Sequence, residues 1–347
     1  MTPETVPTMI SRATGLASLA LLAWALDWTL RLAGADWLFV KGDAASIRQA
    51  ARMAPENAGY AGALARAEPG RAVEILRAAA ARHPLDGGLR IELGKAQEQR
   101  GDFSAARQSL LDATRLDRGF APRAALAEFY CHRRDAERFW PAMREALSVS
   151  YGDGWEQFRQ CWSLTFDAKA ILERAIPDRP HVLRFYLDFL LNEKRLDAST
   201  PVALRVLARA DRGSALSLLN YCDRMLENGR GEQAQIVWDG LVDRNLVVES
   251  GRGFDWRISN IPGIRVQRSA GGWTVHFSGM QPESAEILTR YVTLDPARRY
   301  ILRCPVPERS GLACALTHGR LVLLYRRPPG ASRLEGPVQV GEPGVTQ

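Results

Sequence analysis

Residues 87–117, GGLRIELGKAQEQRGDFSAARQSLLDATRLD, form the stretch that decides how the chain folds. This stretch predicts two amphipathic helices, because apolar residues such as Leu93 and Leu110 recur every three or four positions on one face of each half. Gly101 lies between the halves and suits the left-handed conformation that ends a helix. The side chain of Asp102 is suited to accept hydrogen bonds from the free amides of the next helix. The stretch therefore predicts a helical hairpin.

The same pattern recurs along the chain with a period near 34 residues. A small or apolar residue with partners four and seven positions later begins at Ala72, Ala106, Phe139, Ala168, Ala203 and Ala234, with spacings of 34, 33, 29, 35 and 31. One hairpin cannot bury its apolar face alone, whereas stacked neighbours bury a continuous core. The repeats predict an α-solenoid over residues 43–245, with an extra half unit at 43–53. Residues 151–166 are its least regular part, because they hold two Trp and no glycine turn.

The hairpin resembles a tetratricopeptide repeat (TPR). The resemblance is carried by Leu93-Gly94, Gly101-Asp102-Phe103, Ala106, Leu110, Ala113 and Leu116. It implies a non-enzymatic scaffold for protein–protein interactions, because the first helices of such arrays line a concave face that binds a peptide or helix. The residues expected to line that face are Lys95, Glu98, Arg123, Glu128, Arg159, Arg184 and Asp188.

The N-terminal segment has a polar tail, 1–12, followed by an uncharged run of 14 residues, 13–26. Three interpretations are open: a membrane anchor over 13–38, a secretory signal cleaved near Ala33-Gly34-Ala35, and an apolar helix that caps the solenoid. The anchor is favoured because nothing downstream is hydrophobic enough to span a membrane. It requires a helix that continues past Asp27 and Arg31. On this interpretation the chain crosses the inner membrane once, with its bulk in the periplasm.

From about residue 246 the hydrophobic period changes to two. Apolar residues alternate on both sides of Gly271-Gly272, which predicts a β-hairpin over 264–277. Further strands are predicted at 287–294, 300–304, 311–316 and 320–326. The fold class expected is therefore α+β and multidomain: a solenoid, then a small antiparallel β-sandwich at 246–337 and a flexible tail at 338–347.

This C-terminal portion resembles the carbohydrate-binding, galactose-binding-like β-sandwiches that follow TPR arrays in bacterial envelope and exopolysaccharide proteins. The resemblance is carried by 253–256, 275–279, Tyr291-Val292 with Pro296 and Tyr300, 310–312 and 323–336. It implies a role in the assembly or export of envelope polysaccharide. The interval 312–321 is shorter than in a complete jelly roll, so a truncated sandwich is expected.

Charge leaves a second function class open, a glycan-binding module carried on a TPR spacer. The chain has a net charge of +7, and the portion from Leu246 onward has 13 Arg and 8 acidic residues. The arginines are scattered, which is typical of a solvated surface, and no nucleic-acid partner is expected. An acidic polysaccharide is the alternative partner, with Trp256 and Arg257 as candidate contacts. Most other aromatic residues of this portion are expected in its core.

No motif for catalysis, a cofactor or a metal is present. The sequence lacks G-x-S-x-G, a Walker loop, H-E-x-x-H and G-x-G-x-x-G after a strand. Its five cysteines form no C-x-x-C, although Cys304 and Cys314 are close enough in sequence to pair in an oxidising compartment. The sequence therefore predicts no catalytic, cofactor-binding or metal-binding residue.

Overall fold

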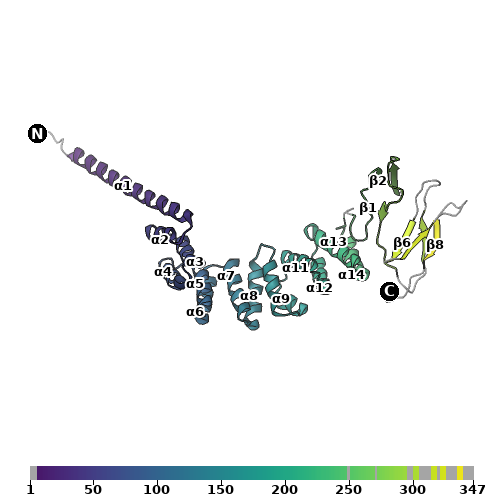
Figure 1. Cartoon of the computed structure of the whole chain (residues 1–347), viewed down its shortest axis with the longest axis horizontal. Helices are drawn as coiled ribbons and strands as arrows, with labels where there is room; N and C mark the ends of the chain where they lie inside the picture. The colour runs from purple at the N-terminus through teal and green to yellow at the C-terminus, as the bar shows by residue number, and fades with distance from the viewer. Residues whose placement is uncertain are drawn as a thin grey trace. The chain divides into compact units, whose positions relative to one another are not determined.

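The computed structural model describes residues 6–247, 251–269, 272–294, 300–304, 314–318, 321–325 and 334–338. The chain divides into two compact units, Met1–Val206 and Leu207–Gln347. Figure 1 shows the order of their helices and strands along the chain. Each unit is described by itself.

The first unit is helical. Its helices are α1 (Val6–Lys41), α2 (Ala44–Met53), α3 (Ala58–Ala67), the short 3-10 helix η1 (Pro69–Arg71), α4 (Ala72–Arg82), α5 (Gly87–Gln99), α6 (Phe103–Leu116), α7 (Phe120–His132), α8 (Ala136–Val149), α9 (Trp155–Leu164), α10 (Ala168–Arg174), α11 (Pro180–Asn192) and α12 (Leu196–Ala208), which ends just past the boundary. Successive helices pair as hairpins in α1–α2, α3–α4, α5–α6 and α7–α8 (Figure 1). This unit is an α-solenoid of TPR-like hairpins, as the repeats predict.

The α5–α6 hairpin owes its close packing to a glycine. A Cβ placed on Gly94 would lie 2.7 Å from Cγ of Leu110, too close for any larger residue without a shift. Gly101 follows the end of α5 and has a φ of +89°, the left-handed conformation predicted for it. The prediction for Asp102 is wrong in one respect: it is the N-cap of α6, but its side chain makes no capping hydrogen bond. Its backbone N–H instead donates to the carbonyl of Gln97 at 2.8 Å, which satisfies a free carbonyl of α5.

The second helices bury the positions that the period selects. Ala106, Leu110, Phe139, Met143 and Ala203 are each fully buried. Because these residues recur at repeat spacing, they place the core between the two helix layers. The predicted repeat register is confirmed.

The α9–α10 unit is built differently. Helix α10 has only seven residues, and the side chain of Asp167 caps it by accepting from the amides of Lys169 and Ala170. Large rings join α9 to the next first helix, α11. The ring of Phe158 lies 5.0 Å from Tyr186, and that of Trp155 lies 5.8 Å from Phe189. The low regularity expected for 151–166 thus reflects aromatic packing.

The end of α1 belongs to the solenoid. Ala35 is fully buried, and Phe39 packs on Tyr60 with ring centroids 4.9 Å apart. The hydroxyl of Tyr60 donates to Asp36, and this bond raises the pKa of Tyr60. The half unit at 43–53 therefore finds its partner helix in the last turns of α1. The prediction of an apolar capping helix holds for these turns.

No helix in the described part of the chain has the length and apolar character needed to cross a membrane. The transmembrane anchor predicted over 13–38 is not supported. About 20 apolar residues are needed for a span. Here the uncharged run of 14 residues is followed by Asp27 and Arg31, which form an ion pair at 2.9 Å.

The second unit begins with the hairpin of α13 (Arg212–Glu227) and α14 (Gly231–Asp243). Its strands are β1 (Arg257–Ile258), β2 (Ile264–Ser269), β3 (Gly272–Phe277), β4 (Leu288–Thr289), β5 (Tyr300–Cys304), β6 (Cys314–His318), β7 (Leu321–Tyr325) and β8 (Leu334–Val338). The pairs are β1–β4, β2–β3, β5–β8 and β6–β7, all antiparallel.

These strands correct several predictions. The hairpin over 264–277 is confirmed, but each described strand has only one partner, so a β-sandwich is not formed by the described residues. Strand β8 was not predicted because Gly336 and Pro337 disfavour a strand, and a proline is tolerated mainly at an edge. The flexible tail was placed at 338–347, yet Val338 ends β8; the rest of that tail, and the side chains of Cys304 and Cys314, lie outside the described residues.

Candidate protein-binding face

Polar side chains link the first helices of neighbouring hairpins. The Nζ of Lys95 on α5 lies 3.0 Å from a carboxylate oxygen of Glu128 on α7. One turn further along the same helices, Glu98 Oε1 lies 3.0 Å from Nδ1 of His132. Two contacts thus join α5 to α7 along one face.

The series continues in both directions. Arg66 on α3 lies 3.5 Å from Glu92 on α5. On the other side, the thiol of Cys131 on α7 lies 3.8 Å from the hydroxyl of Ser163 on α9. Contacts therefore run from α3 through α5 and α7 to α9. We call the residues that make them the first-helix face: Arg66, Glu92, Lys95, Glu98, Glu128, Cys131, His132 and Ser163.

Two ion pairs of this face, Lys95–Glu128 and Arg66–Glu92, are open to water, whereas the Glu98 side chain of the third contact is only 16% exposed. The side chains of Lys95 and Glu128 are 46% and 35% exposed. Exposed pairs of this kind contribute only about 0–1 kcal/mol, because water screens them and ordering two long side chains costs entropy. Their charges alternate in sign, so the face has little net charge. Such pairs can be exchanged for pairs with a bound chain at small cost.

The predicted lining residues divide into three groups. Lys95, Glu98 and Glu128 are brought together as described. Arg123 and Arg159 make contacts near their own helices: Arg123 donates to the carbonyl of Gly119 at 2.9 Å, and Arg159 pairs with Glu156 at 3.6 Å.

The third group lies on α11. Arg184 and Asp188 are half-buried and one helical turn apart. The guanidinium of Arg184 lies 4.9 Å from the ring of Phe185. The role predicted for these two residues stays a prediction.

Five residues of this face were not predicted from the sequence: Arg66, Glu92, Cys131, His132 and Ser163. A usable signal was present. His132 and Glu98 are 34 residues apart, one repeat, and Lys95 and Glu128 are separated by nearly the same interval. In a stack of equal repeats, residues one period apart lie on neighbouring copies of the same helix, so oppositely charged residues at that spacing are candidates for a pair.

None of the three cysteines whose side chains the structure describes is prepared for nucleophilic chemistry. Burial raises the pKa of the Cys131 thiol, and the hydrogen bond with Ser163 offsets only part of this. Burial also raises the pKa of Cys161, and it raises that of Cys222 to about 12. A reactive cysteine has a lowered pKa. Among the described residues there is also no cluster of His, Cys, Asp and Glu that could hold a metal ion.

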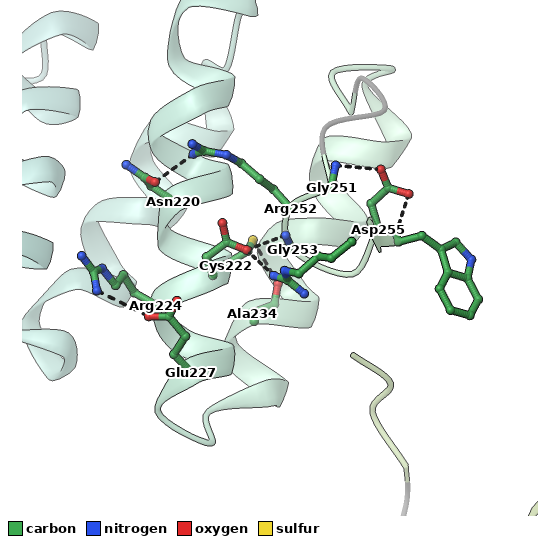
Figure 2. A network of polar contacts seen from close by, with 12 residues as sticks. Asn220, Cys222, Arg224, Glu227, Ala234, Gly251, Arg252, Gly253 and Asp255 are labelled. Carbon is green, nitrogen blue, oxygen red and sulfur yellow. Dashed lines mark hydrogen bonds and ion pairs between the residues drawn. The ribbon is translucent and has the colours of Figure 1, made fainter. Parts of the chain in front are cut away.

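Trp256 and Arg257, the two candidate glycan contacts, follow a loop that packs on the α13–α14 hairpin. The Gly253 N–H and the Nη2 of Arg257 both donate to Oδ1 of Asp223, at 2.7 and 2.6 Å. Figure 2 shows Arg252 reaching Asn220, a contact of 2.9 Å, with the Gly251 amide turned toward Asp255.

The same loop buries an aromatic side chain. Phe254 is buried, with its ring 5.8 Å from that of Trp238 on α14. Gly253 is required beside it, because its φ is +56° and a Cβ there would lie 2.5 Å from the Trp238 ring. The loop therefore caps the α13–α14 hairpin. Glycan binding by Trp256 and Arg257 stays a prediction.

The hairpin packing and the repeat period define a TPR-like α-solenoid. The sequence matches no protein-family model and no curated protein. The chain is similar to the solved structure of YrrB, described as a TPR protein with an unusual peptide-binding site: identity is 15%, the TM-score is 0.28, and the match covers 57% of this chain and 91% of that one.

Two further solved structures show similar values. BtubC (BKLC) from P. vanneervenii matches at 15% identity and a TM-score of 0.28, over 64% of this chain and 94% of that one. The Cut9–Hcn1 hetero-tetramer of the APC/C matches at 14% identity and a TM-score of 0.28, over 61% of this chain but only 46% of that one. Values this low do not define a family, so the assignment rests on the packing described above.

Proposed function

We propose that the protein is a non-enzymatic scaffold whose first-helix face binds a segment of a partner protein. The observation that carries this proposal is the continuous series of exposed polar contacts from α3 to α9. A solenoid offers an extended surface of this kind because each repeat adds one helix to it.

The chemistry of the face favours a partner segment with charges of both signs. Lys95 and Arg66 alternate with Glu92 and Glu128 along neighbouring helices. A partner segment whose charges all have the same sign is repelled at every second position of the face. A segment with charges of both signs can form new ion pairs in place of those within the face. Charge complementarity of this type contributes more to partner choice than to affinity.

Site-specific photo-crosslinking tests the proposal. A photoreactive amino acid at Lys95 and, separately, at His132 is expected to capture the same partner in cells that produce the full chain. The matched control is Gln108, an exposed residue of α6 in the same hairpin as Lys95. Equal capture through Gln108, or different products at the two face positions, contradicts the proposal.

We also propose that the scaffold acts at the inner membrane, with its bulk in the periplasm, in assembly or export of envelope polysaccharide. The support is α1, whose Leu22, Trp24 and Leu30 are each more than 60% exposed. These residues lie on different sides of the helix, and apolar side chains exposed on several sides favour an apolar surrounding. The resemblance of the C-terminal portion to carbohydrate-binding domains supports the polysaccharide role.

Fractionation tests the location. The full chain is expected in the membrane fraction, and a chain without residues 1–32 in the soluble fraction with nearly unchanged helical circular dichroism. This deletion keeps Ala35 and the packed last turns of α1. Recovery of the full chain in the soluble fraction overturns this part of the proposal and leaves the scaffold role untouched.

A further inference from the structure

Three aromatic rings and three arginines gather in the second unit. Their elements are separate in sequence: the loop before β1, strands β1, β2 and β3, and the segment after β4. We call this group the aromatic–arginine cluster, and its members are Trp256, Arg257, Arg268, Trp273, Arg290 and Tyr291.

Ring and guanidinium contacts hold the cluster together. The rings of Trp256 and Trp273 meet edge to face, with centroids 6.4 Å apart. The guanidinium of Arg268 lies 5.5 Å from the Trp273 ring, and that of Arg290 lies 5.9 Å from the Trp256 ring. Each indole therefore has an arginine beside it.

Arg257 has an unused donor inside the cluster. Its guanidinium lies 4.6 Å from the ring of Tyr291, and its Nη2 pairs with Asp223. Its Nη1 is buried and has no hydrogen-bond partner among the described residues. A buried donor without an acceptor costs free energy, so this nitrogen favours an added acceptor, either a water molecule or a ligand oxygen.

Solvent reaches the cluster. Arg268 and Arg290 are exposed, Tyr291 is 39% exposed, and both tryptophans are half-buried. Arg290 is also held in place, because its Nε donates to the carbonyl of Phe254 at 2.8 Å. The cluster thus offers fixed aromatic surface next to fixed positive charge.

We propose that this cluster binds an acidic saccharide, a pyranose chain that carries carboxylates. The apolar face of a sugar ring packs on an aromatic ring, as other apolar surfaces do. A carboxylate accepts hydrogen bonds from a guanidinium in a geometry that the planar fork of arginine matches. The juxtaposition of both groups within one cluster supplies the two contacts that a uronic acid requires.

The charge of this region favours a saccharide over a nucleic acid. Residues 251–269 and 272–294 contain five Arg, no Lys and three acidic residues. A nucleic acid carries one phosphate per nucleotide and calls for a strongly basic surface. The edge-to-face indoles also differ from a row of parallel rings on which successive bases stack. A weakly basic aromatic site fits a polymer of lower charge density.

This proposal goes beyond the scaffold function, because its residues lie in the second unit and the first-helix face lies in the first. Calorimetry on the full chain tests it with three probes: oligogalacturonate, a neutral galactan oligomer and single-stranded DNA. Oligogalacturonate is expected to bind with a Kd between about 1 µM and 1 mM that weakens with salt, since exposed charges are screened within about 10 Å at 0.1 M salt. The neutral oligomer is expected to bind about tenfold more weakly, because it lacks the carboxylate that arginine recognises.

Variants locate the site. Trp256→Ala is expected to weaken oligogalacturonate binding about tenfold at both low and high salt, because aromatic contact is not ionic. Arg268→Ala is expected to weaken it about threefold or more at low salt. Arg265→Ala is the matched control: it removes the same charge from the same strand, but Arg265 pairs with His276 on the opposite face of the β2–β3 ladder.

Circular dichroism and melting of each variant show that it is folded, and Arg268→Ala keeps the test valid if Trp256→Ala fails to fold. Binding that is lost equally in the two arginine variants indicates general charge attraction and overturns the proposal. So does absence of oligogalacturonate binding, equal binding of the neutral oligomer, or tighter binding of DNA.

Discussion

The α5–α6 hairpin and the contact between α9 and α11 belong to the same solenoid but are held together by opposite means. In the first, Gly94 has no side chain, and the fully buried Ala106 and Leu110 pack against it. In the second, the ring of Phe158 on α9 packs against the rings of Tyr186 and Phe189 on α11 and fills the space between these two helices.

The comparison shows that one solenoid can be built by close backbone approach or by large filling side chains. We call the α5–α6 contact the close joint and the α9–α11 contact the filled joint. Opposite kinds of substitution should destabilise them. The close joint is sensitive to added volume, and the filled joint is sensitive to lost volume.

The largest effect is expected at the filled joint. Phe158 is fully buried, so Phe158→Ala should lower the free energy of unfolding by about 4 kcal/mol, through lost burial and the cavity left behind. Phe166→Ala is the control, because Phe166 belongs to the same unit and is 82% exposed. Denaturant unfolding of both variants measures the difference. Equal stability of the two would show that the rings do not fill this joint.

At the close joint, Ala106→Arg should destabilise by about 3 kcal/mol, since it overpacks the joint and buries a charge. Arg107→Ala, at the next and exposed position, should change little. Thermal melting compares the two. An unchanged melting temperature in both variants means that the repeat register is wrong.

A smaller effect is expected from a polar contact that the close joint buries. The hydroxyl of Ser109 on α6 donates to the side-chain carbonyl of Gln97 on α5 at 2.7 Å. Ser109→Ala leaves that oxygen unsatisfied and should cost about 1–2 kcal/mol. Ser104→Ala, an exposed change in the same helix, is the control. A cost no larger than that of Ser104→Ala would show that water replaces the hydroxyl.

The smallest effect is expected in the rate at which cysteine thiols are alkylated. Burial raises the pKa of Cys161 in the filled joint, so this thiol stays protonated and shielded at neutral pH. Half-buried Cys131 should be alkylated by iodoacetamide before buried Cys161 in the native protein. Mass spectrometry of the labelled peptides over time checks the order. Faster labelling of Cys161 than of Cys131 would mean that the aromatic joint opens often.

The sequence allowed the close joint to be predicted because its cause is local. Gly94, Gly101 and Ala106 have the right sizes at the right spacing. The filled joint was recognised only as an irregularity, since rings from α9 and α11 meet across residues that no short-range period relates.

Two other features depend on distant parts of the chain. The packed end of α1 could not be recognised from its apolar run, which predicts an anchor equally well. Contacts with a later helix reveal the packing: the ring of Phe39 packs on Tyr60, and the Tyr60 hydroxyl donates to Asp36. The first-helix face was predicted in part. Lys95, Glu98 and Glu128 were found by position in the repeat, whereas Arg66 and His132 required the geometry of neighbouring first helices.

A charge swap across α5 and α7 tests most directly whether the first-helix face binds a partner. The measurement is the Kd of the partner captured through Lys95, together with the melting temperature, for Lys95→Glu, Glu128→Lys and the double variant. The double variant restores an internal ion pair with reversed polarity. We expect it to recover the melting temperature of the natural chain while its affinity stays about tenfold lower, because the partner meets inverted charges. Full recovery of both quantities would show that the pair only joins two helices, and would contradict the assignment of this face as the binding surface.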